Sequence, residues 1–184
     1  GADEPSVPNI IAGPITNAAN GHWYYLTTQL LWHDAEALGV SLGGHLTTID
    51  DDDENNWVFN TFSSWDGMDR ELWIGLTDEV NEGEWLWSSD SSATYRHWLE
   101  GQPDNYGNQG GEGGEGGGED YAHFWMPNVG APPGTWNDAP GYLSHYGVIE
   151  VGIDLPPPPV TNCIAPPAGL VAWWQAGSNA VDIA

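Results

Sequence analysis

The sequence has no lysine, two arginines and a single cysteine. Asp and Glu number 27, so the formal net charge is −25 at pH 7. A surface of this charge repels nucleic acid and anionic membranes, which excludes nucleic acid as an expected partner. No apolar run approaches the roughly 20 residues that span a bilayer, and we expect no membrane insertion. Because Cys163 is alone, no disulfide can form within the chain.

Aromatic residues and carboxylates are what the chain has in quantity. Twelve of its 184 residues are Trp, and 40% are apolar. Disordered chains are poor in aromatics, so most of this chain is expected to fold around one sizeable core. Clustered carboxylates suit hard divalent cations such as Ca²⁺, which prefer oxygen ligands. The composition therefore favours a folded domain that binds cations.

The hydrophobic pattern predicts a strand, two helices, and then short strands separated by long loops. Apolar spacing predicts a helix over residues 31–42, and two glycines end it. A second helix is predicted over residues 50–62. We interpret its acidic beginning as a helix start, with Asp51 and Glu54 in a capping arrangement, rather than as a metal site. Strands are expected at residues 22–28, 45–49, 71–77, 84–89, 121–126, 135–138 and 146–151.

Composition divides the chain into four segments. Residues 1–13 are expected to be an extended lead-in, and residues 14–151 one α+β domain. A proline-rich linker follows over residues 152–168. Residues 169–184 are too short for a domain, so they form either the start of a following domain or a strand that adds to a neighbouring copy. The glycine-rich stretch 107–118 has the composition of a spacer, but a loop of this length is more often functional.

Side chains with oxygen atoms flank this glycine-rich stretch on both sides. Ca²⁺ takes about six to eight oxygen ligands from carboxylates, amides and water. Gln102 and Asp104 flank Pro103, and a proline between two ligands can hold them in a fixed turn, for which a cis bond is a suitable device. Each pair alone is weak evidence, but together they predict a calcium site. The candidate ligands are Asp78, Glu82, Gln102, Asp104, Glu119, Asp120, Asn137 and Asp138.

These segments, in this order, resemble the C-type lectin domain over roughly residues 14–151. The matching segments are "WHDAEALGVSLGGHLTTI", "LWIGLTDEVNEGEWLW", "GQPDNY", "GGGEDYAHF", "TWND" and "YGVIE". The resemblance implies an α+β, C-type lectin-like fold with two helices, small antiparallel sheets and a long calcium-binding loop region. It also implies a binding module and not an enzyme, and no nucleophile–base arrangement is visible in the sequence.

The resemblance further implies one principal Ca²⁺ site that also holds a sugar. Two vicinal sugar hydroxyls would complete the shell of the ion. In this family the Gln-Pro-Asp form goes with galactose-type ligands and Glu-Pro-Asn with mannose-type ligands. Tyr106 lies where galactose-binding members carry an aromatic that stacks on the apolar face of the sugar. The implied ion ligands are Gln102, Asp104, Glu119, Asn137 and Asp138, and the implied sugar contacts are Gln102, Asp104, Tyr106, Glu119 and Asn137.

An auxiliary Ca²⁺ site is also implied, with two departures from the family pattern. Asn105 stands where a carboxylate is usual, so this site should bind more weakly. The disulfide cysteines of the family are missing, so the Trp-rich core and bound metal must supply the stability. The implied auxiliary ligands are Asp78, Glu82, Asn105, Glu119 and Asp120. The residues at the cysteine positions are Gly39, Tyr121, Gly141 and Ile149.

Two functions stay open at this point. The first is an extracellular, secreted or cell-surface, calcium-dependent module that binds glycans or glycoproteins with galactose-type preference. The second is a structural or adhesive subunit that assembles with copies of itself through the apolar C-terminal tail and Cys163. That tail also resembles the opening of a concanavalin-like (laminin-G-type) domain. The six histidines show no zinc-type spacing, and we expect no histidine metal site.

Overall fold

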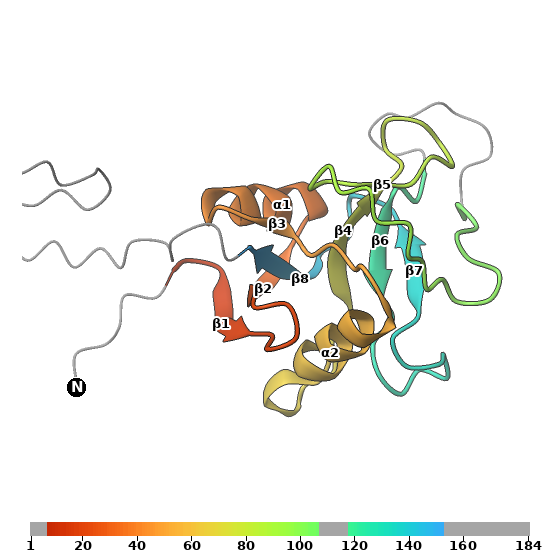
Figure 1. The fold of residues 1–184 in the computed structure, drawn as a ribbon. Coiled ribbons are helices and arrows are strands. Elements are labelled where there is room, and N and C mark those ends of the chain that lie inside the picture. The colour runs from red at the N-terminus through yellow and green to blue at the C-terminus, as the bar shows by residue number, and fades with distance from the viewer. Residues whose placement is uncertain (1–6, 107–117, 153–184) are drawn as a thin grey trace, which may run out of the picture.

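The computed structural model describes residues 7–106 and 118–152, and it contains two α-helices and a twisted sheet (Figure 1). Most of the glycine-rich stretch, the proline-rich linker, Cys163 and the C-terminal tail lie outside the described residues, so predictions about them stay predictions. The elements in chain order are β1 (Ile10–Thr16), β2 (Trp23–Leu30), α1 (Trp32–Ser41), β3 (His45–Leu46), α2 (Asp52–Phe62), the 3-10 turn η1 (Trp65–Gly67), β4 (Leu72–Thr77), β5 (Leu86–Trp87), β6 (Tyr121–Phe124), β7 (Trp136–Ala139) and β8 (His145–Val151).

Both helices form where the sequence predicts them. The Asp51 carboxylate accepts a hydrogen bond of 2.9 Å from the backbone N–H of Glu54, which confirms the predicted cap of α2. In α1, a Cβ atom at Gly39 would lie only 3.0 Å from the backbone of His45. The missing side chain therefore allows α1 to lie close to β3, at a position where the resembled family carries a cysteine.

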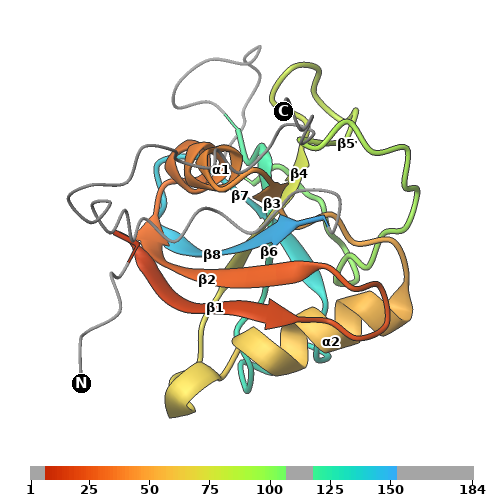
Figure 2. The ribbon, with the colours of Figure 1, turned by 60° about the vertical axis from the view of Figure 1, so that its left-hand side comes forward.

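The strands join into one sheet in the order β1-β2-β8-β4-β6-β7. The β4–β8 pair is parallel, whereas the other pairs in the sheet are antiparallel. The expected small antiparallel sheets are thus present as two groups that this parallel pair connects. Figure 2 shows the strands between α1, above them in that view, and α2, below.

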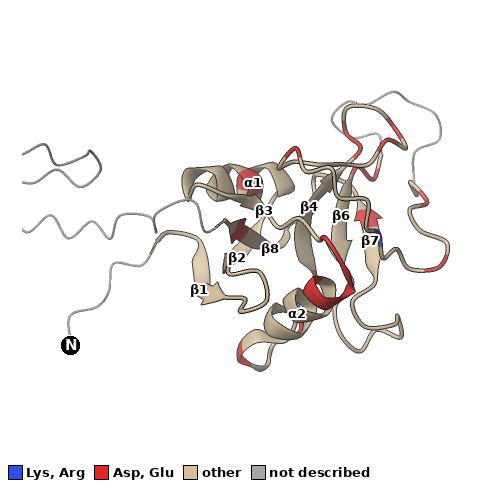
Figure 3. Cartoon of the chain, viewed as in Figure 1, with Lys and Arg blue, Asp and Glu red and all other residues tan. Residues whose placement is uncertain are grey.

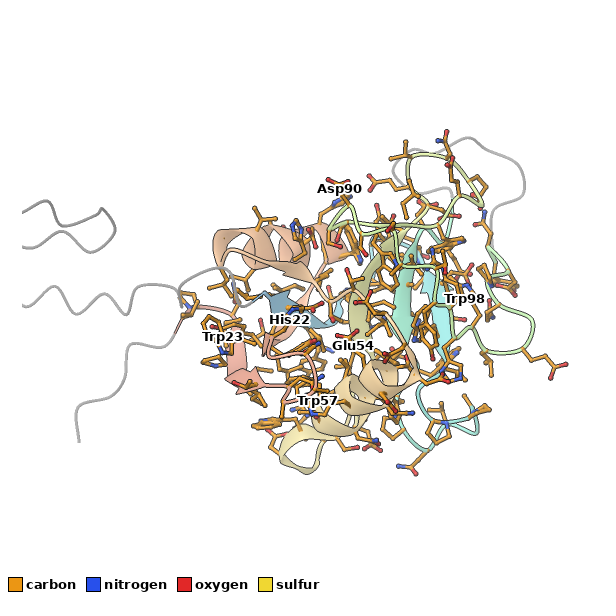
Figure 4. The ribbon with its side chains drawn as sticks, in the orientation of Figure 1. His22, Trp23, Glu54, Trp57, Asp90 and Trp98 are labelled. Carbon is orange, nitrogen blue, oxygen red and sulfur yellow. The ribbon has the colours of Figure 1, made fainter. Side chains whose placement is uncertain are left out.

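The core divides into two clusters, one containing residues of α2 and the other residues of α1. Trp136 in the first and Trp73 in the second have no exposed surface, as expected for core residues. The Trp136 indole N–H donates to Asn55 Oδ1 at 2.8 Å, so this polar group is satisfied within the core. Trp57 on α2 and Trp98 beside β7 pack against the same cluster (Figure 4).

Three strands differ from the sequence prediction. Strand β1 begins at Ile10, within the residues assigned to the extended lead-in, and pairs Ile10 with Thr27 of β2. Pairing with β2 fixes this strand, so the composition of residues 1–13 does not reveal it. The strands predicted at residues 45–49 and 84–89 shorten to β3 and β5, because only two residues of each pair with the sheet.

Candidate metal and ligand-binding site

Three of the predicted ligands converge at one end of the sheet. Asp104 lies in the loop after β5, Glu119 just before β6, and Asp138 on β7. Each offers a carboxylate oxygen, and these oxygens all lie within 4.8 Å of one another. The two ends of the glycine-rich stretch therefore meet at a single site, which the sequence order alone only suggested.

Backbone hydrogen bonds hold these carboxylates in place. Asp138 accepts from the backbone N–H of Asn105 at 2.7 Å and from that of Asp104 at 3.3 Å. Glu119 Oε2 accepts from the N–H of Tyr106 at 2.7 Å, and the Glu119 N–H donates to Asn105 Oδ1 at 2.9 Å. The loop after β5 thus wraps around two carboxylates from outside it, so the cluster is built by the backbone as well as by charge.

Gln102 lies at the base of the same loop. Its peptide bond to Pro103 is cis, as the sequence analysis anticipated. Gly101 before it has a φ of +95°, a conformation that favours glycine. Gln102 Oε1 is buried and has no hydrogen-bond partner among the described residues. A buried carbonyl oxygen without a hydrogen-bond donor is unfavourable, so a bound cation or water is expected beside this atom.

No described hydrogen bond links the side chain of Gln102 or Asn137 to the three carboxylates. The Asn137 amide nitrogen lies 3.2 Å from His123 Nε2 and also contacts the Asp138 carbonyl. The nitrogen and oxygen of an amide point in different directions. Since Asn137 Nδ2 faces the His123 ring, Asn137 Oδ1 points away from it.

The cluster carries uncompensated negative charge. Burial raises the pKa of Glu119 to about 7, and the neighbouring Asp138 and Asp104 carboxylates add to the rise. Burial also raises the pKa of Asp138. Both arginines are used elsewhere, since Arg70 pairs with Asp66 at 2.7 Å and Arg96 donates to backbone carbonyls. Figure 3 shows acidic residues on the loops around this end of the sheet.

The predicted auxiliary ligands form a looser group. Burial raises the pKa of Asp78 to about 7, with the nearby Glu82 and Asp120 carboxylates contributing. Asp78 Oδ2 accepts from the Gly83 N–H at 2.7 Å, whereas Oδ1 is buried without a partner among the described residues. Within residues 7–106 and 118–152, this group is not one of the ligand sets that gather within 4.8 Å. The Asn105 side chain is engaged with Glu119 instead.

Tyr106 stands at the rim of the carboxylate cluster. Its backbone bonds to Glu119, while 81% of the residue surface is exposed to solvent. An exposed aromatic ring beside a polar cluster offers a face on which a ligand can stack.

The structure also gathers a second set of ligand-type residues, which the sequence analysis missed. Glu71, His123 and His145 each present a ligand atom within 4.8 Å of the other two. They are far apart in the sequence, so no spacing motif could reveal them. Their proximity follows from the pairing of β4 with β6 and β8.

Comparison with known proteins decides the family. The family model described as the lectin C-type domain matches residues 28–144. The chain belongs to the C-type lectin family. This membership confirms the resemblance to the C-type lectin domain and the α+β fold class that the sequence predicted. It also supports the prediction that the lectin domain is not an enzyme.

Several curated proteins are similar to this lectin domain. A perlucin-like protein of Mytilus galloprovincialis is 38% identical over 108 residues, which cover 58% of this chain and 60% of that protein. The hepatic lectin of Gallus gallus is 34% identical over 131 residues, or 70% of this chain and 53% of the relative. The galactose-specific lectin nattectin of Thalassophryne nattereri is 39% identical over 75 residues, or 41% and 47%. The chain thus spans only 47% to 60% of the length of these relatives.

Solved structures support the same fold. The carbohydrate-recognition domain of the mouse scavenger receptor C-type lectin aligns with a TM-score of 0.60 at 26% identity, over 82% of this chain and 98% of that one. Lectin CEL-I from Cucumaria echinata aligns at 0.58 and 28% identity, over 79% and 96%. Herring type II antifreeze protein also aligns at 0.58, with 25% identity over 79% and 97%. Since these names describe different ligands, the ligand must be argued from the site itself.

No helix among the described residues has the length and apolar character needed to cross a membrane.

Proposed function

We propose that this lectin domain binds galactose-type glycans through a Ca²⁺ ion at the carboxylate cluster. The observation that carries the proposal is the convergence of the Asp104, Glu119 and Asp138 oxygens within 4.8 Å. Gln102 and Asn137 would supply amide oxygens as further ligands. An extracellular location, secreted or at the cell surface, is part of the same proposal.

The donor set fits Ca²⁺ on the chemistry of the residues present. Carboxylate and amide oxygens are the ligands that this ion prefers. Neutral amide oxygens can fill part of its shell of six to eight ligands without adding negative charge. A cation would also relieve the repulsion that raises the pKa of Glu119. It would give the buried, unpartnered Oε1 of Gln102 an electrostatic partner.

The sugar would bind where these side chains remain accessible. Bound Ca²⁺ supplies coordination of two vicinal sugar hydroxyls. Gln102 and Asp104 would face the same ligand with an amide at one end and a carboxylate at the other, so their order would fix which hydroxyl meets a donor and which meets an acceptor. Tyr106, 81% exposed, would stack on the apolar face of the sugar. The relative named as a galactose-specific lectin supports this preference.

A second Ca²⁺ site around Asp78, Glu82, Asp120, Glu119 and Asn105 belongs to the proposal as a weaker site. The buried, unpartnered Oδ1 of Asp78 supports it. The engagement of Asn105 Oδ1 by the Glu119 N–H weakens it, because that amide oxygen must change partners before it can ligate an ion.

Calorimetric titration with galactose and mannose tests the proposal, in calcium and in a calcium-free chelator buffer. We expect galactose binding in calcium that disappears with the chelator. The double exchange Gln102→Glu with Asp104→Asn should shift the preference toward mannose, because it reverses the order of donor and acceptor. The absence of galactose binding in calcium would refute the proposed ligand, and equal binding in the chelator would refute the proposed role of the ion.

Tyr106 provides a sharper test of how the sugar lies. Tyr106→Ala should weaken galactose binding by about 3-fold to 10-fold, since a stacked aromatic contributes about 0.5–1.5 kcal/mol. The matched control is Tyr142→Ala, which removes another exposed tyrosine, 71% accessible, from the loop before β8. Because Tyr106 is exposed, its loss should leave the melting temperature unchanged. Equal affinities for the two variants would show that Tyr106 does not contact the sugar.

A further inference from the structure

We propose that Glu71, His123 and His145 form a binding site for a divalent transition-metal ion of the zinc class, separate from the calcium-type carboxylate cluster. One ligand atom from each residue lies within 4.8 Å of the others. Two imidazoles and one carboxylate are a ligand set that suits Zn²⁺ and its neighbours, whereas Ca²⁺ prefers oxygen ligands alone.

The sheet register brings these three residues to one face. Trp73 of β4 pairs with His123 of β6 and with Gly147 of β8. Side chains alternate between the two faces of a strand. Glu71 and His145 lie two residues before Trp73 and Gly147 respectively, so they share the face of Trp73 and His123. The convergence is therefore a consequence of strand pairing and not of one side-chain rotamer.

Histidine–glutamate pairs are common in this chain, so a pair alone would mean little. His22, His33 and His45 each pair with a glutamate, as His145 does with Glu71 at 3.1 Å. Among the described residues, only the Glu71 pair has a second histidine completing a three-ligand set. The His123 and His145 rings have centroids 4.8 Å apart. This second imidazole turns an ordinary pair into a chelating arrangement.

The Nε2 atom of His145 points to a missing ligand. His145 directs Nδ1 to Glu71, while its Nε2 is buried and has no partner among the described residues. His123 directs Nδ1 to the Phe124 carbonyl at 3.0 Å. A metal-binding histidine characteristically uses one ring nitrogen for the ion and gives the other N–H to a carboxylate or carbonyl. His145 shows that division among the described residues, whereas His123 Nε2 is in contact with the Asn137 amide at 3.2 Å.

Binding requires a modest rearrangement of the cluster. Tetrahedral Zn²⁺ with bonds of about 2.0–2.1 Å holds its ligand atoms roughly 3.3 Å apart. The two ring planes are inclined by only 22°, so their lone pairs do not converge until one ring turns. His123 Nε2 would also exchange its contact with Asn137 Nδ2, now 3.2 Å, for the ion. His145, at the start of β8 with 12% of its side chain exposed, is the less buried of the two rings.

Zinc titration of the intact chain tests the site, read by calorimetry and by metal analysis after dialysis. Saturating calcium is present throughout so that carboxylate sites are occupied. Wild-type protein should retain one Zn²⁺ per chain. His145→Gln and Glu71→Gln should each lower the affinity for Zn²⁺ by about ten-fold or more. His33→Gln is the matched control, because it removes a histidine that also pairs with a glutamate but whose side chain is 60% exposed. Co²⁺ should give the visible absorption of a tetrahedral site in the wild type and lose it in His145→Gln.

The alternative metal location is tested by Glu119→Gln, which alters the carboxylate cluster and leaves the histidines intact. Zinc binding unchanged in Glu119→Gln supports the histidine site, whether or not calcium binds to the domain. No stoichiometric zinc in the wild type, or zinc lost in Glu119→Gln but kept in both His145→Gln and Glu71→Gln, would overturn the proposal. Thermal unfolding of each variant without metal confirms that the fold is retained.

Discussion

Calcium affinity of this lectin domain should fall about ten-fold between pH 8 and pH 6 because of Glu119 alone. Burial, together with the Asp138 and Asp104 carboxylates, raises the pKa of Glu119 to about 7 in the calcium-free domain. A carboxyl with this pKa is roughly 90% ionised at pH 8 and roughly 10% ionised at pH 6. The ion requires the ionised form, so binding releases a proton and weakens as the pH falls. The raised pKa of Asp138 acts in the same direction.

The stability of the calcium-free domain should fall as the pH rises, and the increment that calcium adds should change in the opposite direction. Without calcium, native Glu119 keeps a proton that the unfolded chain releases, so stability falls as the pH rises from about 4.5 to about 7. With free calcium at 100 times its dissociation constant at pH 8, the ion stabilises the domain by about 2.7 kcal/mol. A ten-fold weaker affinity at pH 6 reduces this to about 1.4 kcal/mol at the same calcium concentration.

Thermal unfolding and calorimetric titration at pH 6, 7 and 8 measure both quantities, in calcium and in metal-depleted buffer. The difference between the two conditions removes the contribution of groups that calcium does not affect. Glu119→Gln should weaken calcium binding and flatten its pH dependence. Asp78→Asn, which changes the auxiliary group, should keep the pH step. A dissociation constant that changes less than two-fold across this range, or a melting temperature insensitive to calcium, would refute the reasoning.

Two further predictions concern the fold. Gly44→Ala should destabilise the domain by about 3 kcal/mol, because a Cβ there would lie 1.9 Å from a backbone oxygen of β8, whereas Gly152→Ala meets no described atom within 4 Å and should be neutral. Asn55→Ala should cost about 1 to 3 kcal/mol in chemical denaturation, since it leaves the buried Trp136 indole N–H without its acceptor, and Asn56→Ala on the exposed side of α2 is the control. Equal stability within either pair would contradict the respective argument.

Local pattern predicts the helices of this chain well. Helix α1 falls within the apolar repeat of residues 31–42, and α2 begins at the cap that Asp51 provides. Both signals reside in a few neighbouring residues. The strands are less predictable, because β1 depends on pairing with β2 and the two-residue β3 depends on pairing with β8, far along the chain.

The candidate site divides in the same way. Sequence order identifies Asp104, Glu119 and Asp138 as members of one site, and the structure brings their oxygens together. The Asn137 amide contacts His123 and the backbone carbonyl of Asp138, and no described hydrogen bond joins it to the three carboxylates. The two arginines differ in their partners, since Arg70 pairs with Asp66 whereas Arg96 donates to backbone carbonyls and lies over the Trp87 ring.

The sequence by itself indicated the family, the two helices and the absence of an internal disulfide, and it supplied the cation ligands that we propose. Each follows from residue type, local spacing or the order of motifs. Only the tertiary structure decided that β4 and β8 pair in parallel, that the two ends of the glycine-rich stretch meet, and that Glu71, His123 and His145 share one face. Those outcomes depend on contacts between residues far apart in the chain, and no local pattern encodes such contacts.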